Sequence, residues 1–369
     1  MIPFVDLRAI HQPLYSELVE AFTGVLDGNA FVLGPAVEQF ERSFAAYVGR
    51  KHCVGLNSGT SALHLALKSY GIGPGDEVIT TPHTFVATAW AISYCGARPV
   101  FADVEASTGN INSEQVRALV TPRTKAILPV DLYGNPAALT VLEEVAATNG
   151  LRLIDDACQA HGSRLSGRPV GSFGDVACFS FYPAKNLGAV GEGGAVVTDD
   201  DALADRLRML RDHAQVGRHN HVEIGFNYRM EGVQGAVLGI KLHYLDSWNS
   251  ARSHAAARYF ELLSGLEGVR LPSVTPGGEP NWHLFVVRVA SRERVIRSMQ
   301  EMGVQTAVHY PVPVHLQPAY AHLGYRKGDF PEAEAFASSC LSLPMFPTIT
   351  EGDQVRVAKS LAVAVGGAA

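Results

Sequence analysis

One lysine of the sequence stands where it could do chemistry. Lys185 ends the almost wholly apolar stretch 177–184 and is followed by glycines. A lysine held in a partly dry pocket has a lowered pKa and can act as a nucleophile or a base. The alternative is a lysine whose stem only carries its charge to the surface, the usual fate of this residue type.

A pair of carboxylates precedes this lysine by about thirty residues. Asp155 and Asp156 follow the apolar run 151–154, so the pattern places them at the carboxyl end of a buried strand. Ligands in open α/β sheets bind at that edge. Taken alone, either aspartate could equally cap the N-terminus of a following helix.

The segment 57–63, Asn-Ser-Gly-Thr-Ser-Ala-Leu, links another apolar run to a helix expected to begin near Ser61. Gly59 lets the backbone approach a ligand closely, while Thr60 and Ser61 offer hydroxyl groups. A helix start presents free N–H groups, and such a site suits a phosphate. Ordinary N-capping explains the segment by itself about as well.

Together, these three features meet the needs of pyridoxal phosphate (PLP). The lysine would hold the cofactor covalently, and the glycine-containing turn would anchor its phosphate. The carboxylate would keep the pyridine nitrogen protonated, so that the ring withdraws electrons from the substrate carbon.

Other motifs carry less weight. Segment 71–75, Gly-Ile-Gly-Pro-Gly, resembles part of a dinucleotide-binding loop, but it follows a helix and contains a proline, so it predicts a helix end and a turn. His213, His219 and His221 lack a carboxylate or cysteine partner at ligand spacing, so we expect no metal site.

The pattern between about residues 50 and 240 is typical of an α/β domain. Apolar runs separated by helices predict strands buried on both faces of a mostly parallel sheet. The expected strands are 52–56, 78–80, 99–101, 126–130, 151–154, 176–181 and 195–197, and the expected helices include 61–69, 138–148 and 202–211.

The pattern changes at about residue 245. A long helix is expected at 245–263, a strand at 282–289 and a helix at 294–302, which together indicate a smaller α+β domain. The predicted division is a large PLP-binding domain at 12–244 and a small C-terminal domain at 245–369, with segment 1–11 packing on the small one.

Composition excludes several classes of protein. The 369 residues are 47% hydrophobic and 18% charged, which excludes disorder for the bulk of the chain. The formal net charge of −6 disfavours a nucleic-acid partner, because binding by counterion release needs a basic surplus. No run of about 18 apolar residues predicts a membrane span. The five cysteines, with no C-x-x-C pair, predict a reduced cytoplasmic protein.

The chain resembles the DegT/DnrJ/EryC1/StrS family of PLP-dependent sugar aminotransferases over nearly its whole length. The resemblance implies an aspartate-aminotransferase-like (type I PLP) fold and a homodimer with shared active sites. The matching stretches are SGTSAL (58–63), GIGPGDEVI (71–79), TFVATAWAI (84–92), AILPVDLYGNP (126–136), IDDACQAHG (154–162), FSFYPAKNLGAVGEGGAVVT (179–198), GFNYRMEGVQGAVLGIKL (225–242), HYPVPVH (309–315) and LSLPM (341–345).

The resemblance also implies roles for single residues. Lys185 would hold the cofactor and move the proton, and Asp156 would pair with the pyridine nitrogen. Phe85 would stack on the ring, and Gln159 would lie near the ring and its 3-hydroxyl. The residues that would hold the phosphate are Gly59, Thr60, Ser61, Ser180 and, from the neighbouring subunit, Asn227.

Three positions depart from the family's usual pattern. Asp131 stands where the family usually has His, Glu192 replaces an Asp and Cys158 replaces a common Ala. Lys185 does not depart. Dehydratase relatives carry His at that position, so the lysine favours transamination.

The implied reaction converts a nucleotide-linked keto-sugar to an amino-sugar with glutamate as donor. Segments 282–285 and 309–315 look most like members that act on dTDP-linked 3-keto-deoxyhexoses. Arg229, His309 and Tyr310 are the candidate substrate-binding residues. The alternatives are a 4-keto-sugar or scyllo-inosose aminotransferase and, with less support, a sugar dehydratase or a non-enzymatic regulator on the same fold.

Overall fold

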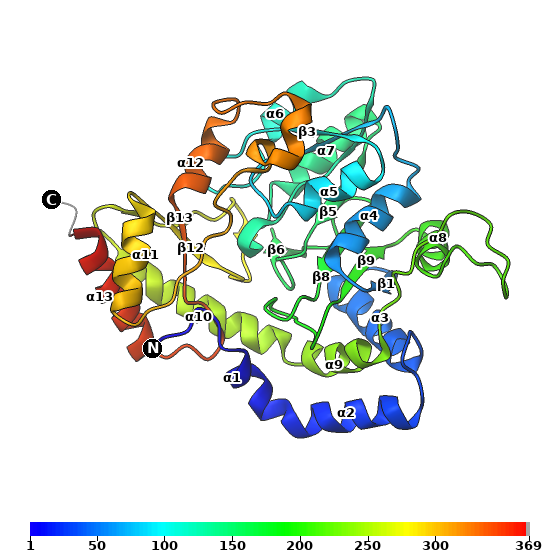
Figure 1. Ribbon diagram of the computed structural model, residues 1–369, viewed down its shortest axis with the longest axis horizontal. Helices are drawn as coiled ribbons and strands as arrows, with labels where there is room; N and C mark the ends of the chain where they lie inside the picture. The colour runs from blue at the N-terminus through cyan, green and yellow to red at the C-terminus, as the bar shows by residue number, and fades with distance from the viewer. Residues whose placement is uncertain (367–369) are drawn as a thin grey trace.

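The computed structural model describes residues 1–366 and contains a large central sheet of seven strands in the order β1-β9-β8-β5-β4-β2-β3 (Figure 1). Strands β8, β5, β4, β2 and β3 run parallel, and β9 lies antiparallel to both of its neighbours. The mostly parallel sheet predicted from the sequence is therefore confirmed. The strands are β1 (His52–Leu56), β2 (Glu77–Thr80), β3 (Arg98–Phe101), β4 (Thr124–Ile127), β5 (Arg152–Asp156), β8 (Val176–Ser180) and β9 (Gly194–Thr198).

Helices cover both faces of this sheet, which explains why its strands are continuously apolar. Successive residues of a strand point to opposite faces. In β8, Ala177 and Phe179 enter one core while Val176 and Cys178 enter the other. The first core lies under α3 (Pro35–Val48), α6 (Ser113–Leu119), α7 (Leu139–Asn149) and α9 (Gly232–Leu242), and the second under α4 (Gly59–Ser69), α5 (Ala87–Tyr94) and α8 (Asp201–Arg211).

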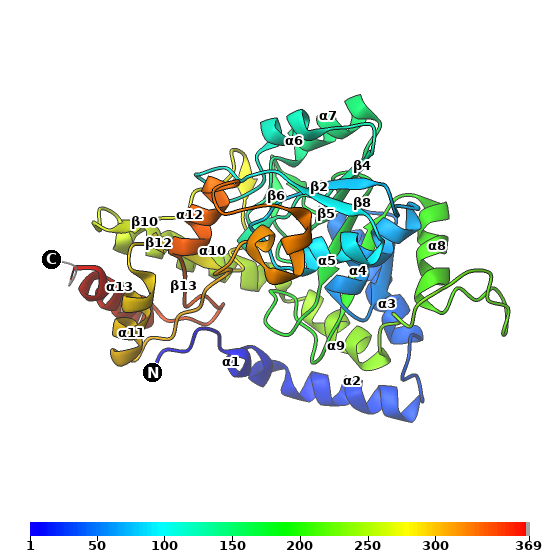
Figure 2. The ribbon, with the colours of Figure 1, turned by 45° about the horizontal axis from the view of Figure 1, so that its top comes forward.

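A second, antiparallel sheet orders the C-terminal part of the chain. It consists of β10 (Val269–Arg270), β12 (Phe285–Val289) and β13 (Cys340–Leu343). Its core also takes in Ile2, which forms a bridge with Val304. The helices that pack there are α10 (Leu245–Leu263), α11 (Arg292–Glu301) and α13 (Glu351–Gly366), which Figure 2 shows on the side of the molecule that carries both termini.

Helix α10 joins the two cores. Leu245 at its first residue packs in the core of the large sheet, whereas Ala255 and the buried residues after it pack in the C-terminal core. We therefore keep the boundary at 244/245 as a proposal. The remaining elements are α1 (Leu7–His11), α2 (Tyr15–Asp27), α12 (Pro331–Ser339), the small sheet β11 (Gly278–Glu279), β6 (Arg164–Leu165) and β7 (Arg168–Pro169), and 3-10 turns at Gln12–Leu14, Leu132–Gly134, Val314–Leu316 and Pro318–Leu323.

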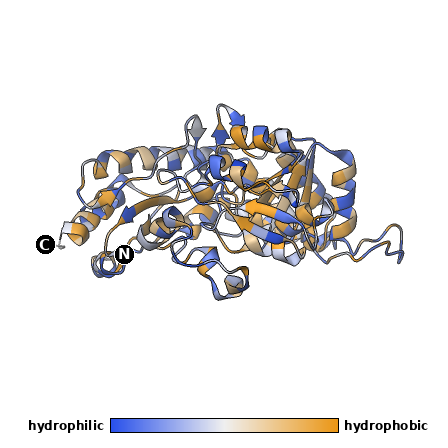
Figure 3. Cartoon of the chain, turned by 90° about the horizontal axis from the view of Figure 1, so that it is seen from above, coloured by the Kyte–Doolittle hydropathy of each residue, from blue (hydrophilic) through white to orange (hydrophobic). Residues whose placement is uncertain are grey.

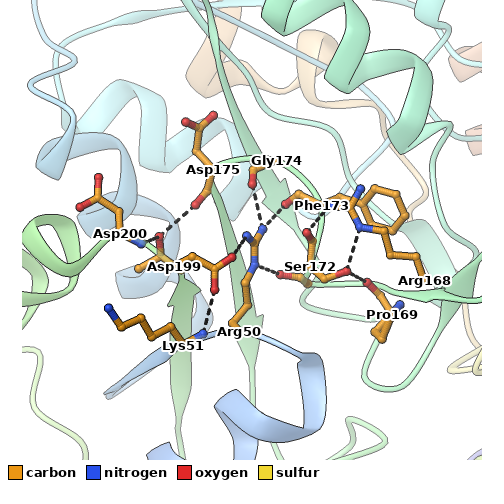
Figure 4. A network of polar contacts seen from close by, with 12 residues as sticks. Arg50, Lys51, Arg168, Pro169, Ser172, Phe173, Gly174, Asp175, Asp199 and Asp200 are labelled. Carbon is orange, nitrogen blue, oxygen red and sulfur yellow. Dashed lines mark hydrogen bonds and ion pairs between the residues drawn. The ribbon is translucent and has the colours of Figure 1, made fainter.

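Arg50 ties three strands of the large sheet together at one edge (Figure 4). Its guanidinium donates to the carbonyl oxygens of Gly171, Phe173 and Gly174 at 2.8, 2.7 and 2.8 Å and pairs with Asp199 at 2.7 Å. These contacts lie where β1 and β8 begin and β9 ends. Directional hydrogen bonds, most of them partly buried, thereby hold the edge of the sheet opposite to the strand ends that bear Asp156 and Ser180.

Apolar residues follow the strands of the central sheet, and the outer helices alternate apolar and polar residues (Figure 3). Helix α2 lies along the lower side of Figure 1 and exposes a run of apolar side chains, Tyr15, Val19, Phe22 and Leu26. Within residues 1–366, no helix is both long enough and apolar enough to cross a membrane.

Candidate active site

A cavity of about 650 Å³ lies at the carboxyl ends of the parallel strands, between the large sheet and the C-terminal part of the chain. Nine of the residues predicted from the sequence line it. They are Gly59, Thr60, Phe85, Asp156, Gln159, Ser180, Lys185, His309 and Tyr310. Ser61, Asn227 and Arg229 do not line it.

Lys185 projects from the turn that follows β8. The turn is closed by hydrogen bonds from the Lys185 N–H to Tyr182 O at 2.8 Å and from the Ala189 N–H to Phe181 O at 2.8 Å. Burial lowers the pKa of the Lys185 ammonium, and the nearby Cys158 and Asp156 oppose that shift less strongly. A lowered pKa makes the neutral amine, which can accept a proton, more accessible at neutral pH.

Asp156 is the last residue of β5 and is only 4% exposed. Its Oδ2 accepts a hydrogen bond from the Thr88 hydroxyl at 2.8 Å, and its Oδ1 accepts one from the Cys158 N–H at 3.3 Å. Burial raises the pKa of this carboxyl above its ordinary value, and these two donors work against the rise. The group therefore lacks a full complement of partners and can hold a further cationic donor.

The start of α4 forms a close-fitting cradle. A Cβ at Gly59 would lie 2.6 Å from the Cβ of Ser180 and 3.0 Å from the Cys158 sulfur, so only glycine fits beside this strand end. The N–H groups in the first turn of a helix have no partner within it and point outward. The Ser61 hydroxyl donates to Asn57 Oδ1 at 2.6 Å, and the Ser61 N–H donates to the Ser58 hydroxyl at 3.0 Å. The hydroxyl of Ser61 is thus already engaged within this turn, and Ser61 does not line the cavity.

Aromatic and amide side chains form another part of the wall. Phe85 is 50% exposed, and its ring centroid lies 5.6 Å from that of Tyr310. Gln159 donates through Nε2 to the Tyr310 hydroxyl at 3.2 Å and accepts through Oε1 from the Tyr133 N–H at 2.7 Å. His309 contacts the Ser342 hydroxyl through Nδ1 at 2.9 Å, and burial lowers the pKa of its imidazole to about 4.

Asn227 and Arg229 lie outside the cavity in the single chain. The Arg229 guanidinium donates to Asn227 Oδ1 at 2.9 Å and pairs with Asp212 at 2.9 Å. Asn227 is exposed, and its carbonyl accepts from the Asn57 side chain at 3.2 Å. The sequence suggested that these residues act on a site, but neither of them lines this cavity within residues 1–366.

The three departures from the family pattern have different surroundings. Glu192 lines the cavity and is exposed, and Cys158 lines it beside Gly59. Asp131 lies behind it, fully buried, and accepts from the Ala137 N–H at 2.7 Å. Burial raises the pKa of Asp131 to about 7, and burial beside Asp131 raises the pKa of Asp155 well above its usual range.

Sequence reasoning missed several cavity residues. Thr88 carries a local signal, because it follows Phe85 by three residues within the matching stretch 84–92. His283 lies within the segment 282–285 that was singled out, but nothing local distinguishes it from a core residue. Phe4 and Val5 have no signal at all, since only the folded chain brings residue 4 beside His309, with ring centroids 5.7 Å apart.

The residues present fit PLP. The cradle at Gly59 leaves room where a Cβ would collide, a buried carboxylate with spare acceptor capacity lines the cavity, and a lysine with a lowered pKa shares it. No group of three or more His, Cys, Asp or Glu side chains in residues 1–366 is arranged to hold a metal ion.

Comparison with known proteins gives a family match and close relatives. Residues 13–362 match the DegT/DnrJ/EryC1/StrS aminotransferase family. The chain is 47% identical over 356 residues to the dTDP-3-amino-3,4,6-trideoxy-alpha-D-glucose transaminase of Streptomyces venezuelae, covering 96% of this chain and 94% of that relative.

Solved structures of similar proteins superpose closely on this chain. The crystal structure of DesV from S. venezuelae superposes with a TM-score of 0.96 at 46% identity and covers 98% of each chain. NtdA from Bacillus subtilis, solved with bound cofactor PMP, superposes with a TM-score of 0.91 at 31% identity, covering 99% of this chain and 85% of that one.

Proposed function

The chain belongs to the DegT/DnrJ/EryC1/StrS aminotransferase family, and we propose that it transfers an amino group to a keto-sugar linked to a nucleoside diphosphate. Its fold is the aspartate-aminotransferase-like α/β fold expected from the sequence, and its cofactor is PLP.

The observation that carries the proposal is the presence of Lys185 and Asp156 in one cavity with the cradle at Gly59. PLP, when bound, supplies an electron sink that stabilises negative charge on the substrate carbon. Asp156 would hold the proton of the pyridine nitrogen, and Gly59, Thr60 and Ser180 would hold the phosphate.

Lys185 would move the proton. Burial lowers the pKa of its ammonium, so the amine can take a proton from the carbon that bears the amino group of the donor. In the second half of the reaction the same side chain would return a proton to the sugar carbon. Phe85 would cover one face of the ring and, with Tyr310, exclude water from it.

We further propose a homodimer with shared sites. Asn227 and Arg229 lie outside the cavity of their own chain, and Asn227 is exposed, which leaves its side chain accessible to a second subunit. Asn227 would reach the phosphate in the partner's site, and Arg229 would meet the diphosphate of the substrate as a fixed donor fork.

The proposed substrate is a dTDP-linked 3-keto-deoxyhexose, with glutamate as donor. Support comes from the relative named as a dTDP-3-amino-3,4,6-trideoxy-alpha-D-glucose transaminase. His309 and Tyr310 would contact the sugar. A 4-keto-sugar or scyllo-inosose substrate remains the alternative, and Lys185 disfavours dehydration. The five cysteines are free, in keeping with a cytoplasmic location.

The test is a panel of nucleotide-linked keto-sugars and scyllo-inosose, each incubated with the PLP-loaded protein and glutamate. Mass spectrometry identifies aminated products, and NMR identifies the carbon that carries nitrogen. Amination at C3 of a dTDP-sugar supports the proposal. Amination only of scyllo-inosose, or only at C4, replaces the substrate, and loss of a sugar hydroxyl without amination contradicts transamination.

A further inference from the structure

His283 lies in the cavity wall contributed by the C-terminal part of the chain and is 8% exposed. It precedes β12, and both its backbone N–H and its backbone carbonyl form hydrogen bonds. Its N–H donates to Asn281 Oδ1 at 2.9 Å, and its carbonyl accepts from Arg252 at 3.4 Å. The side chain is therefore presented to the cavity from a fixed backbone.

Asn186, the residue after Lys185, contacts only one of the two ring nitrogens of His283, Nδ1. The Asn186 amide nitrogen donates to the Asn281 carbonyl at 3.0 Å and to Asn249 Oδ1 at 2.8 Å. The orientation of Asn249 is itself fixed, because its amide nitrogen donates to the His161 carbonyl at 2.8 Å. The Asn186 oxygen must then face the His283 ring.

This arrangement decides where the proton of His283 lies. The Asn186 oxygen, an acceptor only, is 3.2 Å from His283 Nδ1, so Nδ1 carries the proton and donates it. In a neutral imidazole the other nitrogen, Nε2, then has a free lone pair. Among residues 1–366, no protein group forms a hydrogen bond with Nε2, whereas Nδ1 has Asn186 as its partner.

The surroundings keep the ring neutral. Burial lowers the pKa of His283 well below its ordinary value, and the positive charges of Lys185 and Arg252 lower it further, together with His309 and His161. All of these causes act in the same direction. The cavity thus contains, beside Lys185, a nitrogen that accepts a hydrogen bond and cannot donate one.

We propose that His283 is a substrate-binding residue whose Nε2 accepts a hydrogen bond from one hydroxyl group of the bound keto-sugar. The inference rests on the proposed function and adds to it a determinant of specificity. A sugar offers hydroxyl donors, whereas the carboxylates of glutamate offer only acceptors. A residue of the cavity wall that can only accept a hydrogen bond favours a sugar with a hydroxyl group next to it. A deoxy carbon or a carbonyl at that place would leave the lone pair of Nε2 without a donor.

The test compares His283→Phe, which keeps a planar ring without an acceptor, with His283→Gln, whose amide oxygen can take the place of Nε2. His243→Phe, at an exposed histidine after α9, is the matched control. The two half-reactions are followed separately by the absorbance of the cofactor, first with glutamate and then with the keto-sugar. Calorimetry measures binding of the amino-sugar nucleotide to each variant.

We expect His283→Phe to lower kcat/KM for the sugar half-reaction by about tenfold, the effect of one neutral hydrogen bond. Binding of the amino-sugar nucleotide should weaken by a similar factor. The glutamate half-reaction should be unchanged, and His283→Gln should restore most of the loss. The effect of His283→Phe should vanish for one member of a set of sugars that each lack a single hydroxyl, and that member identifies the hydroxyl bound.

An equal loss in both half-reactions, or the same loss for the parent sugar and every deoxy analogue, overturns the inference. Either result would mean that His283 acts by positioning Lys185 or by packing in the cavity wall. If His283→Phe does not fold, His283→Asn tests the same point, because its shorter amide reaches Asn186 but not the position of Nε2. A wild-type protein that neither binds nor aminates any nucleotide sugar contradicts the proposed function instead, which separates the two failures.

Discussion

Two buried carboxyl groups behind the cavity predict how the stability of the protein depends on pH. Asp131 and Asp155 are both 0% exposed and lie against each other. Asp131 Oδ1 accepts from the Ala137 N–H, but Asp131 Oδ2 and both oxygens of Asp155 have no other donor among the described residues. The nearby charge of Asp156 raises the pKa of both groups further, whereas the positive charge of Arg50 lowers the pKa of Asp155. Two carboxyls so placed cannot both ionise, and a proton held by Asp155 is donated to Asp131.

The sign and size of the effect follow from the raised pKa. Asp131 titrates at about 7 in the folded protein and at about 3.9 when unfolded, so the native state binds this proton more tightly. The stabilisation is complete below pH about 4 and is lost as the pH rises towards 7. For Asp131 alone the slope is at most about 1.4 kcal/mol per pH unit, and the window between its unfolded and folded pKa amounts to roughly 4 kcal/mol as an upper limit. The raised pKa of Asp155 keeps its proton in place through this window.

Asp131→Asn should remove the contribution of Asp131 to this pH dependence. The amide oxygen can still accept from the Ala137 N–H, and the amide nitrogen donates permanently to Asp155. The free energy of unfolding of the variant minus that of the wild type should therefore increase by up to about 1.4 kcal/mol for each pH unit between pH 5 and 7.

The assay is urea unfolding at pH 5, 6, 7 and 8 at one protein concentration, since an oligomer's stability depends on concentration. Asp27→Asn, which removes an equal charge at an exposed position at the end of α2, is the control and should run parallel to the wild type. Parallel curves for Asp131→Asn and the wild type across this range would refute the shared-proton reasoning.

Four further outcomes are expected. The protein loaded with PLP should be yellow, and borohydride should fix the cofactor on Lys185, as peptide mapping would show; a label on another lysine contradicts the assignment. Asp156→Asn should retain bound cofactor yet lose about a hundredfold or more in turnover, because an amide cannot stabilise a protonated pyridine by charge. Gly59→Ala should weaken PLP binding measured by fluorescence titration, because its Cβ would meet Ser180 at 2.6 Å, whereas Gly239→Ala in α9, where nothing lies within 4 Å, should leave it unchanged. Mixed dimers of Lys185→Ala and Asn227→Asp, each inactive alone, should recover towards half of the wild-type activity per dimer; no recovery despite proven subunit exchange would show that Asn227 does not act across the interface.

Much of the fold could be predicted from the sequence because its signals are local. The helix expected at 245–263 has those bounds in the structure, and each expected strand of the large sheet is present within a few residues. The strand expected at 282–289 begins only at Phe285, because the residues before it follow the cavity wall. The antiparallel direction of β9 was not predicted, since an apolar run has the same pattern in either direction.

The sequence by itself also determined which residues meet in the core of the site. Asp156 and Ser180 end strands β5 and β8, Gly59 and Lys185 come soon after β1 and β8, and the carboxyl ends of parallel strands meet at one edge. Only the tertiary structure decided that Ser61 does not line the cavity, that Phe4 does, that Asp131 lies against Asp155, and that Nε2 of His283 forms no hydrogen bond within residues 1–366. Each of these depends on contacts between segments far apart in the chain, and such contacts are set by packing and hydrogen-bond partners that no local pattern encodes.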